Sequence, residues 1–170
     1  LARTGIIMAM ASIIMLFGTL ISSFFVLKIR LVESLHLPEN TLIIGIINTA
    51  LLCFTSISYI FSEKMYKQEK FNTHETWLFF TVLGGYGFIL GQWLLWSELK
   101  TLGIPITFGQ LSDMFYVISG VHLLHILIGQ SLLLWVQLSR NNNYKRIQNV
   151  GMVWHFLTIL WVAMFISILL

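Results

Sequence analysis

Three histidines are the only side chains in the apolar parts of this sequence that could carry a charge near neutral pH. His122 and His125 lie at the centre of one long apolar segment, and His155 lies in the last one. In a helix with 3.6 residues per turn, His122 and His125 share one face with Gly129. Contact of two imidazoles with lipid is energetically unfavourable, so we expect this face of the helix to pack against other parts of the protein.

Three kinds of chemistry are open to these histidines. Paired histidines on facing helices are the usual axial ligands of a b-type haem in a helical bundle. Neighbouring spans, however, cross the membrane in opposite directions, so His125 and His155 lie at depths in the membrane that differ by roughly 10 Å. This distance is too large for both histidines to bind one haem iron. A divalent metal usually needs three or four ligands, and no cysteine or intramembrane carboxylate accompanies the pair. The sequence therefore favours neutral imidazoles that form hydrogen bonds between helices, with Ser119, Gln130, Thr158 or backbone carbonyls as partners.

Five apolar segments must hold these residues in place. The chain has 170 residues, of which 57% are hydrophobic and 10% charged, and its mean hydropathy is +0.84. Each segment exceeds the ~20 residues that are needed to cross a hydrocarbon core of ~30 Å. We therefore predict an all-α integral membrane protein, with residues 1–170 forming a single membrane domain of five transmembrane helices. The predicted spans are approximately 4–27, 40–62, 76–97, 112–139 and 147–170.

The basic residues predict the orientation of the chain in the membrane. Seven of the ten Lys and Arg residues lie at the N-terminus or in the loops 63–75 and 140–146. Lys28, Arg30 and Lys100 lie on the opposite side. Because basic residues accumulate in cytoplasmic loops, we expect a cytoplasmic N-terminus and a periplasmic C-terminus.

Fixed charges are confined to the loops and to the ends of the spans. All seven acidic residues lie there, and the most polar stretch, residues 63–70, is expected to be a solvated linker. Proton pumps and ion-coupled transporters need buried groups that change charge, so the composition argues against both classes. The net charge of +3 is spread over short loops and predicts no nucleic-acid-binding surface.

Two motifs stand out in the last two apolar segments. Residues 119–129 read Ser-Gly-Val-His-Leu-Leu-His-Ile-Leu-Ile-Gly, which resembles the penultimate helix of subunit III of haem-copper (cytochrome c) oxidases, Thr-Gly-Phe-His-Gly-Leu-His-Val followed by a Gly. Residues 153–161 read Val-Trp-His-Phe-Leu-Thr-Ile-Leu-Trp, similar to its last-helix signature, Tyr-Trp-His-Phe-Val-Asp-Val-Val-Trp. Gln92, Trp96 and Glu98 stand where the family has a Gln, a Trp and a Glu. The resemblance covers almost the whole chain and matches the short five-helix form.

The sequence departs from this family at its intramembrane carboxylates. Ile13 stands at the position of a frequent Glu, and Thr158 at that of the Asp in the last-helix motif. Leu94 and Leu95 replace a Tyr-Glu pair, and Leu123 replaces the Gly between the paired histidines. The chain therefore resembles a divergent branch, in which roles that depend on those acids are not expected.

The resemblance implies an accessory subunit without catalytic or metal-binding residues. In the family, subunit III binds no haem or copper, packs beside subunit I, helps to maintain proton uptake, and holds phospholipids between its first two helices and the rest. We therefore expect a multi-pass protein of a bacterial inner membrane, with bound phospholipid and no nucleic acid. Its partners would be above all oxidase subunit I, then subunit II and the members of any larger respiratory supercomplex, and the partner subunits would carry the haem and copper.

Two sets of residues are candidates for functional positions. The family motifs supply structural or interhelical residues, namely His122, His125, Gly129, Trp154, His155, Trp161, Gln92, Trp96 and Glu98. Small residues that permit close approach of helices or acyl chains define a candidate lipid cleft, namely Gly18, Ser22, Ser23, Ser56 and Ser58. Trp154 and Trp161 lie seven residues apart on one face, which fits either an interfacial aromatic belt or a subunit contact.

Two alternative functions stay open. One is subunit III of a quinol oxidase, or the related helper of bacterial nitric oxide reductase, because the electron donor binds other subunits. The other is a b-type cytochrome or quinone-reactive membrane anchor that uses His122 or His125 with His155. A Soret absorption band in the purified chain would indicate the second alternative.

Overall fold

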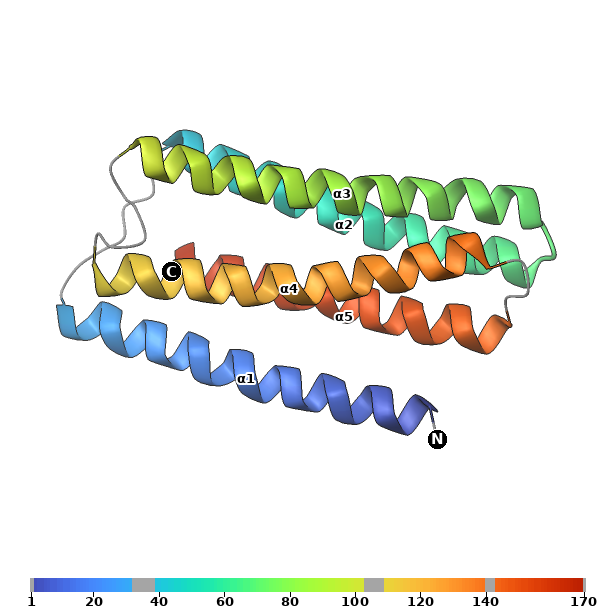
Figure 1. Ribbon diagram of the computed structural model, residues 1–170, viewed down its shortest axis with the longest axis horizontal. Coiled ribbons are helices and arrows are strands. Elements are labelled where there is room, and N and C mark those ends of the chain that lie inside the picture. Colours follow the sequence, from blue (N-terminus) through green and yellow to red (C-terminus); the bar gives the residue numbers. More distant parts are fainter. Residues whose placement is uncertain (1, 32–38, 103–108, 140–142, 170) are drawn as a thin grey trace.

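Five long α-helices make up the described part of the chain. The computed structural model describes residues 2–31, 39–102, 109–139 and 143–169. The helices are α1 (Ala2–Leu31), α2 (Glu39–Lys67), α3 (Phe71–Thr101), α4 (Gln110–Leu138) and α5 (Tyr144–Leu169), and each is long and apolar enough to cross a membrane. The prediction of an all-α protein with five membrane-spanning helices is confirmed. The two termini lie toward opposite ends of the bundle, while the side of the membrane on which each lies stays a prediction (Figure 1).

The helices extend beyond the uncharged segments, and one sequence-based expectation is wrong as a result. Residues 63–67 continue α2 instead of forming a solvated linker, and the chain turns only at residues 68–70. The extension is stabilised from α5, since the Tyr144 hydroxyl donates to Glu63 Oε1 at 3.0 Å. The ring of Tyr66 also packs on His74 of α3, with centroids 4.9 Å apart. Glu63, Lys64 and Lys67 therefore lie on the end of a helix, and only Glu69 and Lys70 lie in the turn.

The helix pair α2 and α3 is the most closely packed part of the fold. Figure 1 shows the two helices side by side along one edge of the bundle, with α4 and α5 beneath them. Two glycines of α3 make this approach possible. A Cβ at Gly84 would lie 2.3 Å from Thr55 Cγ2, and a Cβ at Gly91 would lie 1.9 Å from Asn48 Oδ1. Small residues at helix contacts let backbones approach closely in a membrane, as the glycines of this span predict.

Helix α1 lies on the far side of the bundle and corrects the predicted grouping of the helices. It packs against α4 and α5, and within the described residues it makes no contact with α2, which packs against α3 and α5 (Figure 1). The first two helices therefore do not form a unit set apart from the last three. The reason is visible in the side chains, since the buried rings of α1, Phe17 and Phe24, belong to the same core as α4 and α5.

Candidate functional site

His122 lies at the centre of an aromatic enclosure built by three other helices. Its side chain is 0% exposed. The ring centroids of Phe17 on α1, Phe88 on α3 and Trp161 on α5 lie 6.0, 6.2 and 5.2 Å from that of His122. We call these four residues the His122 cluster. The prediction that this face of α4 packs against protein is confirmed, since Gly129 is buried as well.

The other two histidines are half-buried and use different partners. His125 Nδ1 lies 2.7 Å from the Val121 carbonyl oxygen of its own helix, and its ring packs edge-on against Phe17. His155 Nδ1 pairs with the Ser56 hydroxyl, which joins α5 to α2. His125 therefore bonds within its own helix instead of between helices as expected, whereas His155 does join two helices, through Ser56, a partner that sequence reasoning did not foresee.

The side chains predicted to pair with the histidines are engaged elsewhere. Ser119 Oγ accepts a hydrogen bond from Trp96 Nε1 at 3.1 Å. Gln130 Nε2 donates to the carbonyl oxygen of Val82 at 2.7 Å, and the Thr158 hydroxyl donates to a carbonyl of its own helix at 3.1 Å. The predicted pairing of the histidines with these three side chains is wrong. Each of these three side chains forms its hydrogen bond within its own helix or with a neighbouring helix instead.

His122 and His155 lie at different heights along the bundle. Trp161, which contacts His122, follows His155 by six residues on α5, and six residues correspond to about 9 Å along a helix. A difference in depth was expected for His125 and His155, and the structure shows one for His122 and His155. Among the described residues, no three His, Cys, Asp or Glu side chains come together in a group that could hold a metal ion.

Trp154 and Trp161 form polar contacts between α5 and α2. Their side chains are 1% and 2% exposed. Trp154 Nε1 donates to Thr55 Oγ1 at 3.2 Å, and Trp161 Nε1 donates to Thr49 Oγ1 at 3.0 Å. Both expectations for this pair, an interfacial belt and a subunit contact, are wrong because the two indoles lie inside the bundle.

The remaining motif residues lie along the contacts of α3 and α4. Gly129 allows α5 to approach, since a Cβ there would lie 2.8 Å from Leu157 Cδ1. Gln92 is 0% exposed, and neither its amide nitrogen nor its amide oxygen has a partner among the described residues. Trp96 is half-buried against α4, and Glu98 is half-buried one turn from the end of α3.

The five residues of the candidate lipid cleft do not come together. Gly18, Ser22 and Ser23 are exposed on α1, which does not touch α2. Ser56 pairs with a histidine of α5, and the Ser58 hydroxyl donates to the Trp77 carbonyl oxygen at 2.9 Å. The predicted cleft is therefore misplaced, because the serines of α2 face the inside of the bundle.

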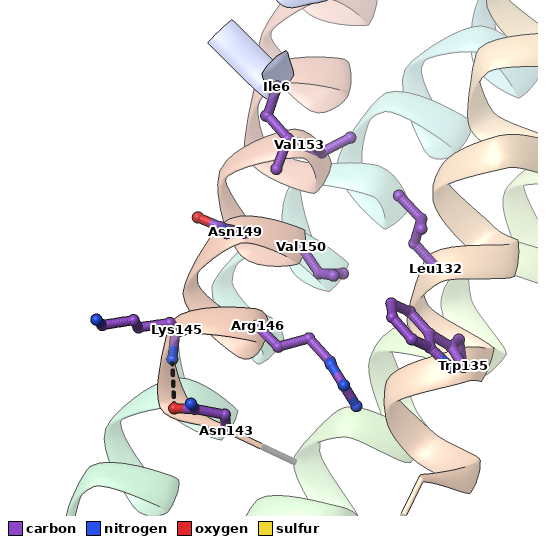
Figure 2. A pocket seen from close by; sticks show the side chains of 9 residues that line it. All are labelled: Ile6, Leu132, Trp135, Asn143, Lys145, Arg146, Asn149, Val150 and Val153. Carbon is purple, nitrogen blue, oxygen red and sulfur yellow. Dashed lines mark hydrogen bonds between the residues drawn. The ribbon is translucent and has the colours of Figure 1, made fainter. Parts of the chain in front are cut away.

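A cavity of about 420 Å³ lies instead between α1, α4 and α5, near the start of α5. Figure 2 shows its lining, in which Arg146 and Trp135 face each other across the gap between α5 and α4. The guanidinium carbon of Arg146 lies 4.4 Å from the centre of the Trp135 ring. Apolar side chains form most of the wall, with polar and cationic groups at one end, namely Ile6, Leu132, Val150, Val153, Asn143, Lys145 and Asn149. Such a cavity suits a molecule with an apolar chain and an anionic head.

Sequence reasoning missed a repeat of buried polar residues on α2. Thr41, Asn48, Thr55 and Ser62 recur every seven residues and are 1%, 3%, 0% and 0% exposed. A repeat of seven keeps residues near one face of a helix, so this pattern marks the buried side of α2. The recurrence of polar residues at this spacing in an apolar segment could have revealed the buried side of α2.

The comparisons with known proteins agree with the motifs. No family model matches the chain. The chain is 28% identical to cytochrome c oxidase subunit 3 of Thermostichus vulcanus, over 95% of the chain and 83% of that protein. It is 25% identical to the protein of the same name from Locusta migratoria, over 98% of the chain and 67% of the relative. For Bacillus subtilis (strain 168), the identity is 29% over 70% of the chain and 61% of the relative.

Fold and motif contacts together define a class of protein, a five-helix membrane bundle whose motif histidines and tryptophans lie within the bundle. Within that class, the chain is a divergent relative of proteins named cytochrome c oxidase subunit 3. The resemblance to subunit III is confirmed. The chain spans about half the length of some of these relatives, such as that of Drosophila yakuba, of which it covers 50%.

Proposed function

We propose that this chain is an accessory subunit III of a respiratory haem-copper terminal oxidase in a bacterial inner membrane. The observation that carries the proposal is the similarity to proteins named cytochrome c oxidase subunit 3 over 95% of the chain in one relative and 98% in another. In this function the chain has no catalytic centre, and haem and copper belong to the partner subunits I and II. It supports subunit I, the site of O₂ reduction, by presenting a membrane-embedded scaffold.

The use of the motif histidines and tryptophans supports a scaffolding role. His155, Trp154 and Trp161 each join α5 to α2 through a hydroxyl group. Such contacts between helices stabilise a membrane bundle in which burial of apolar surface drives little association, because lipid is as apolar as the core. We propose that these contacts keep the surface that meets subunit I in one shape.

We further propose that the chain retains a phospholipid in the cavity between α1, α4 and α5, in place of the cleft predicted from the sequence. An acyl chain would lie along Leu132, Val150 and Val153, and the phosphate would lie near Arg146. Trp135 supports this arrangement by holding the guanidinium group through a cation–π contact. A lipid retained beside subunit I would help to keep proton uptake and turnover constant.

Purification through an affinity tag on this chain in mild detergent tests the proposed subunit. We expect a haem a and copper subunit I to be recovered with the tagged chain, and the isolated chain to show no Soret band. A quinol oxidase or nitric oxide reductase would be recognised by its haem type and by the electron donor that it oxidises. Recovery with unrelated partners, or a haem spectrum from the chain alone, would contradict the proposal.

Native mass spectrometry tests the lipid independently of the partner. In Arg146→Gln, we expect loss of an anionic phospholipid that the unaltered chain retains through detergent exchange. The matched control is Arg30→Gln, since Arg30 is exposed at the other end of α1. Equal retention of the phospholipid by both variants would contradict the proposed lipid site. It would not contradict the proposal that the chain is an oxidase subunit.

A further inference from the structure

Asn48, Gln92 and His122 are among the buried polar side chains of the bundle that have unpaired atoms. Asn48, Gln92 and His122 are 3%, 0% and 0% exposed. Asn48 Nδ2, both side-chain polar atoms of Gln92 and both ring nitrogens of His122 have no hydrogen-bond partner among the described residues. Buried polar groups in folded proteins are almost always paired, and bulk water does not reach the core of a membrane bundle. These five atoms therefore need an explanation.

Gln92 and His122 face each other across the contact of α3 with α4. Phe88, four residues before Gln92, touches the ring of His122, with centroids 6.2 Å apart. Trp96, four residues after Gln92, donates to Ser119 of α4 at 3.1 Å. Residues four apart lie on the same side of a helix. Gln92 therefore points at α4 between Ser119 and His122, which are themselves one turn apart.

Asn48 joins this pair from α2. A Cβ at Gly91 would lie 1.9 Å from Asn48 Oδ1, so the Asn48 amide rests on the backbone of α3 next to Gln92. Thr49, the next residue of α2, accepts a hydrogen bond from Trp161, whose ring lies 5.2 Å from that of His122. Asn48 thus lies at the same level of the bundle as Gln92 and His122, on a third helix.

We propose that Asn48, Gln92 and His122 bind ordered water inside the bundle. Each carboxamide offers donors and an acceptor, and an uncharged imidazole offers one of each, which is the mixture that water satisfies. A buried water molecule typically makes about three hydrogen bonds to groups that are otherwise unpaired. An apolar ligand would leave all five atoms unpaired, and the three side chains include no carboxylate or thiolate to hold a cation. The bound water would connect α2, α3 and α4 through these five unpaired atoms.

Hydroxyl-radical footprinting by X-ray radiolysis of the full chain in its complex tests this site directly. Radicals that form from bound water modify rings next to it, so we expect modification of Phe88, which is 0% exposed. Phe24, which is 1% exposed and lies away from the polar side chains, is the internal control and should stay unmodified. Modification of Phe88 should fall to the level of Phe24 in Gln92→Met. An unmodified Phe88 in the unaltered chain would overturn the proposal.

Thermal unfolding of the same variant gives a second, independent readout. Methionine matches the shape of glutamine and removes its amide. If water pairs the amide, we expect Tm to fall by about 2–4 °C, the shift that loss of roughly one hydrogen bond causes in a chain of this size. If the amide were unpaired, Tm would rise, because an apolar group would replace a buried polar one, and the proposal would be overturned. Gln148→Met, at an exposed position of α5, is the matched control and should leave Tm unchanged.

Discussion

Helices α1 and α2 have similar lengths and compositions but are held in the fold in different ways. In the most apolar stretch of α1, 11% of the residues are buried, against 33% in α2. Helix α1 is attached mainly through two aromatic rings, Phe17 and Phe24. Helix α2 accepts or donates hydrogen bonds through Thr49, Thr55 and other hydroxyl groups that face α3 and α5. Apolarity alone therefore places a helix in the membrane, while buried polar and small residues determine its neighbours.

The largest difference between the two helices should appear when an aromatic side chain is removed. Phe17→Ala leaves a cavity in the His122 cluster, and loss of a buried Phe typically costs about 3–5 kcal/mol of stability. We expect α1 to separate from α4 and α5 while the other four helices stay folded, measured by protease accessibility of α1 in detergent. Phe54→Ala is the matched control on α2, where the ring is 50% exposed and should matter little. Unfolding of the whole chain by Phe17→Ala would show that α1 is not attached independently.

Addition of one methyl group should have opposite effects on the packed pair and on α1. Gly91→Ala places a Cβ against Asn48 and forces α2 and α3 apart, which should cost about 1–3 kcal/mol through overpacking. Gly18→Ala on α1 meets no atom within 4 Å, so it should be neutral or stabilising by up to about 1 kcal/mol. Thermal unfolding in one detergent measures both. Equal effects at the two positions would contradict the difference in packing.

Removal of one hydroxyl group should produce the smallest effect of the three. Thr49→Val keeps the shape of the side chain but leaves the buried Trp161 N–H without an acceptor, at a cost of about 1–2 kcal/mol. Thr19→Val removes an exposed hydroxyl of α1 that bonds only to the carbonyl of Leu16, so stability should change little. A blue shift of the Trp161 fluorescence in Thr49→Val would report the lost hydrogen bond. If Thr19→Val lowered stability as much as Thr49→Val, the difference proposed between α1 and α2 would be contradicted.

The number of helices and their approximate ends could be predicted from hydropathy, because an apolar run of this length rarely forms anything other than a membrane-spanning helix. The ends were less accurate where charged residues continue a helix, as at 63–67. The motif that holds His122 was located correctly, and its buried face followed from helical periodicity. Hydropathy contains no information about which helix packs against which, and so it did not predict the separation of α1 from α2.

The partners of the candidate site residues were the part that sequence reasoning could not supply. Ser56 and His155 are 99 residues apart, and only the packing of α2 on α5 brings them together. Trp154 and Trp161 were expected either in an interfacial aromatic belt, because indoles are common there, or at a subunit contact. Their burial depends on Thr49 and Thr55, which supply the acceptors that a buried indole N–H needs.

The attachment of α1 to α4 and α5 has a consequence for how the protein is made. Among these five helices α1 is synthesised first, while α4 and α5, the helices that it packs against, follow only after α2 and α3. During that interval α2 and α3 can pair as a hairpin, whereas α1 must wait in the membrane surrounded by lipid. The helix that is inserted first of these five is thus among the last of them to be packed.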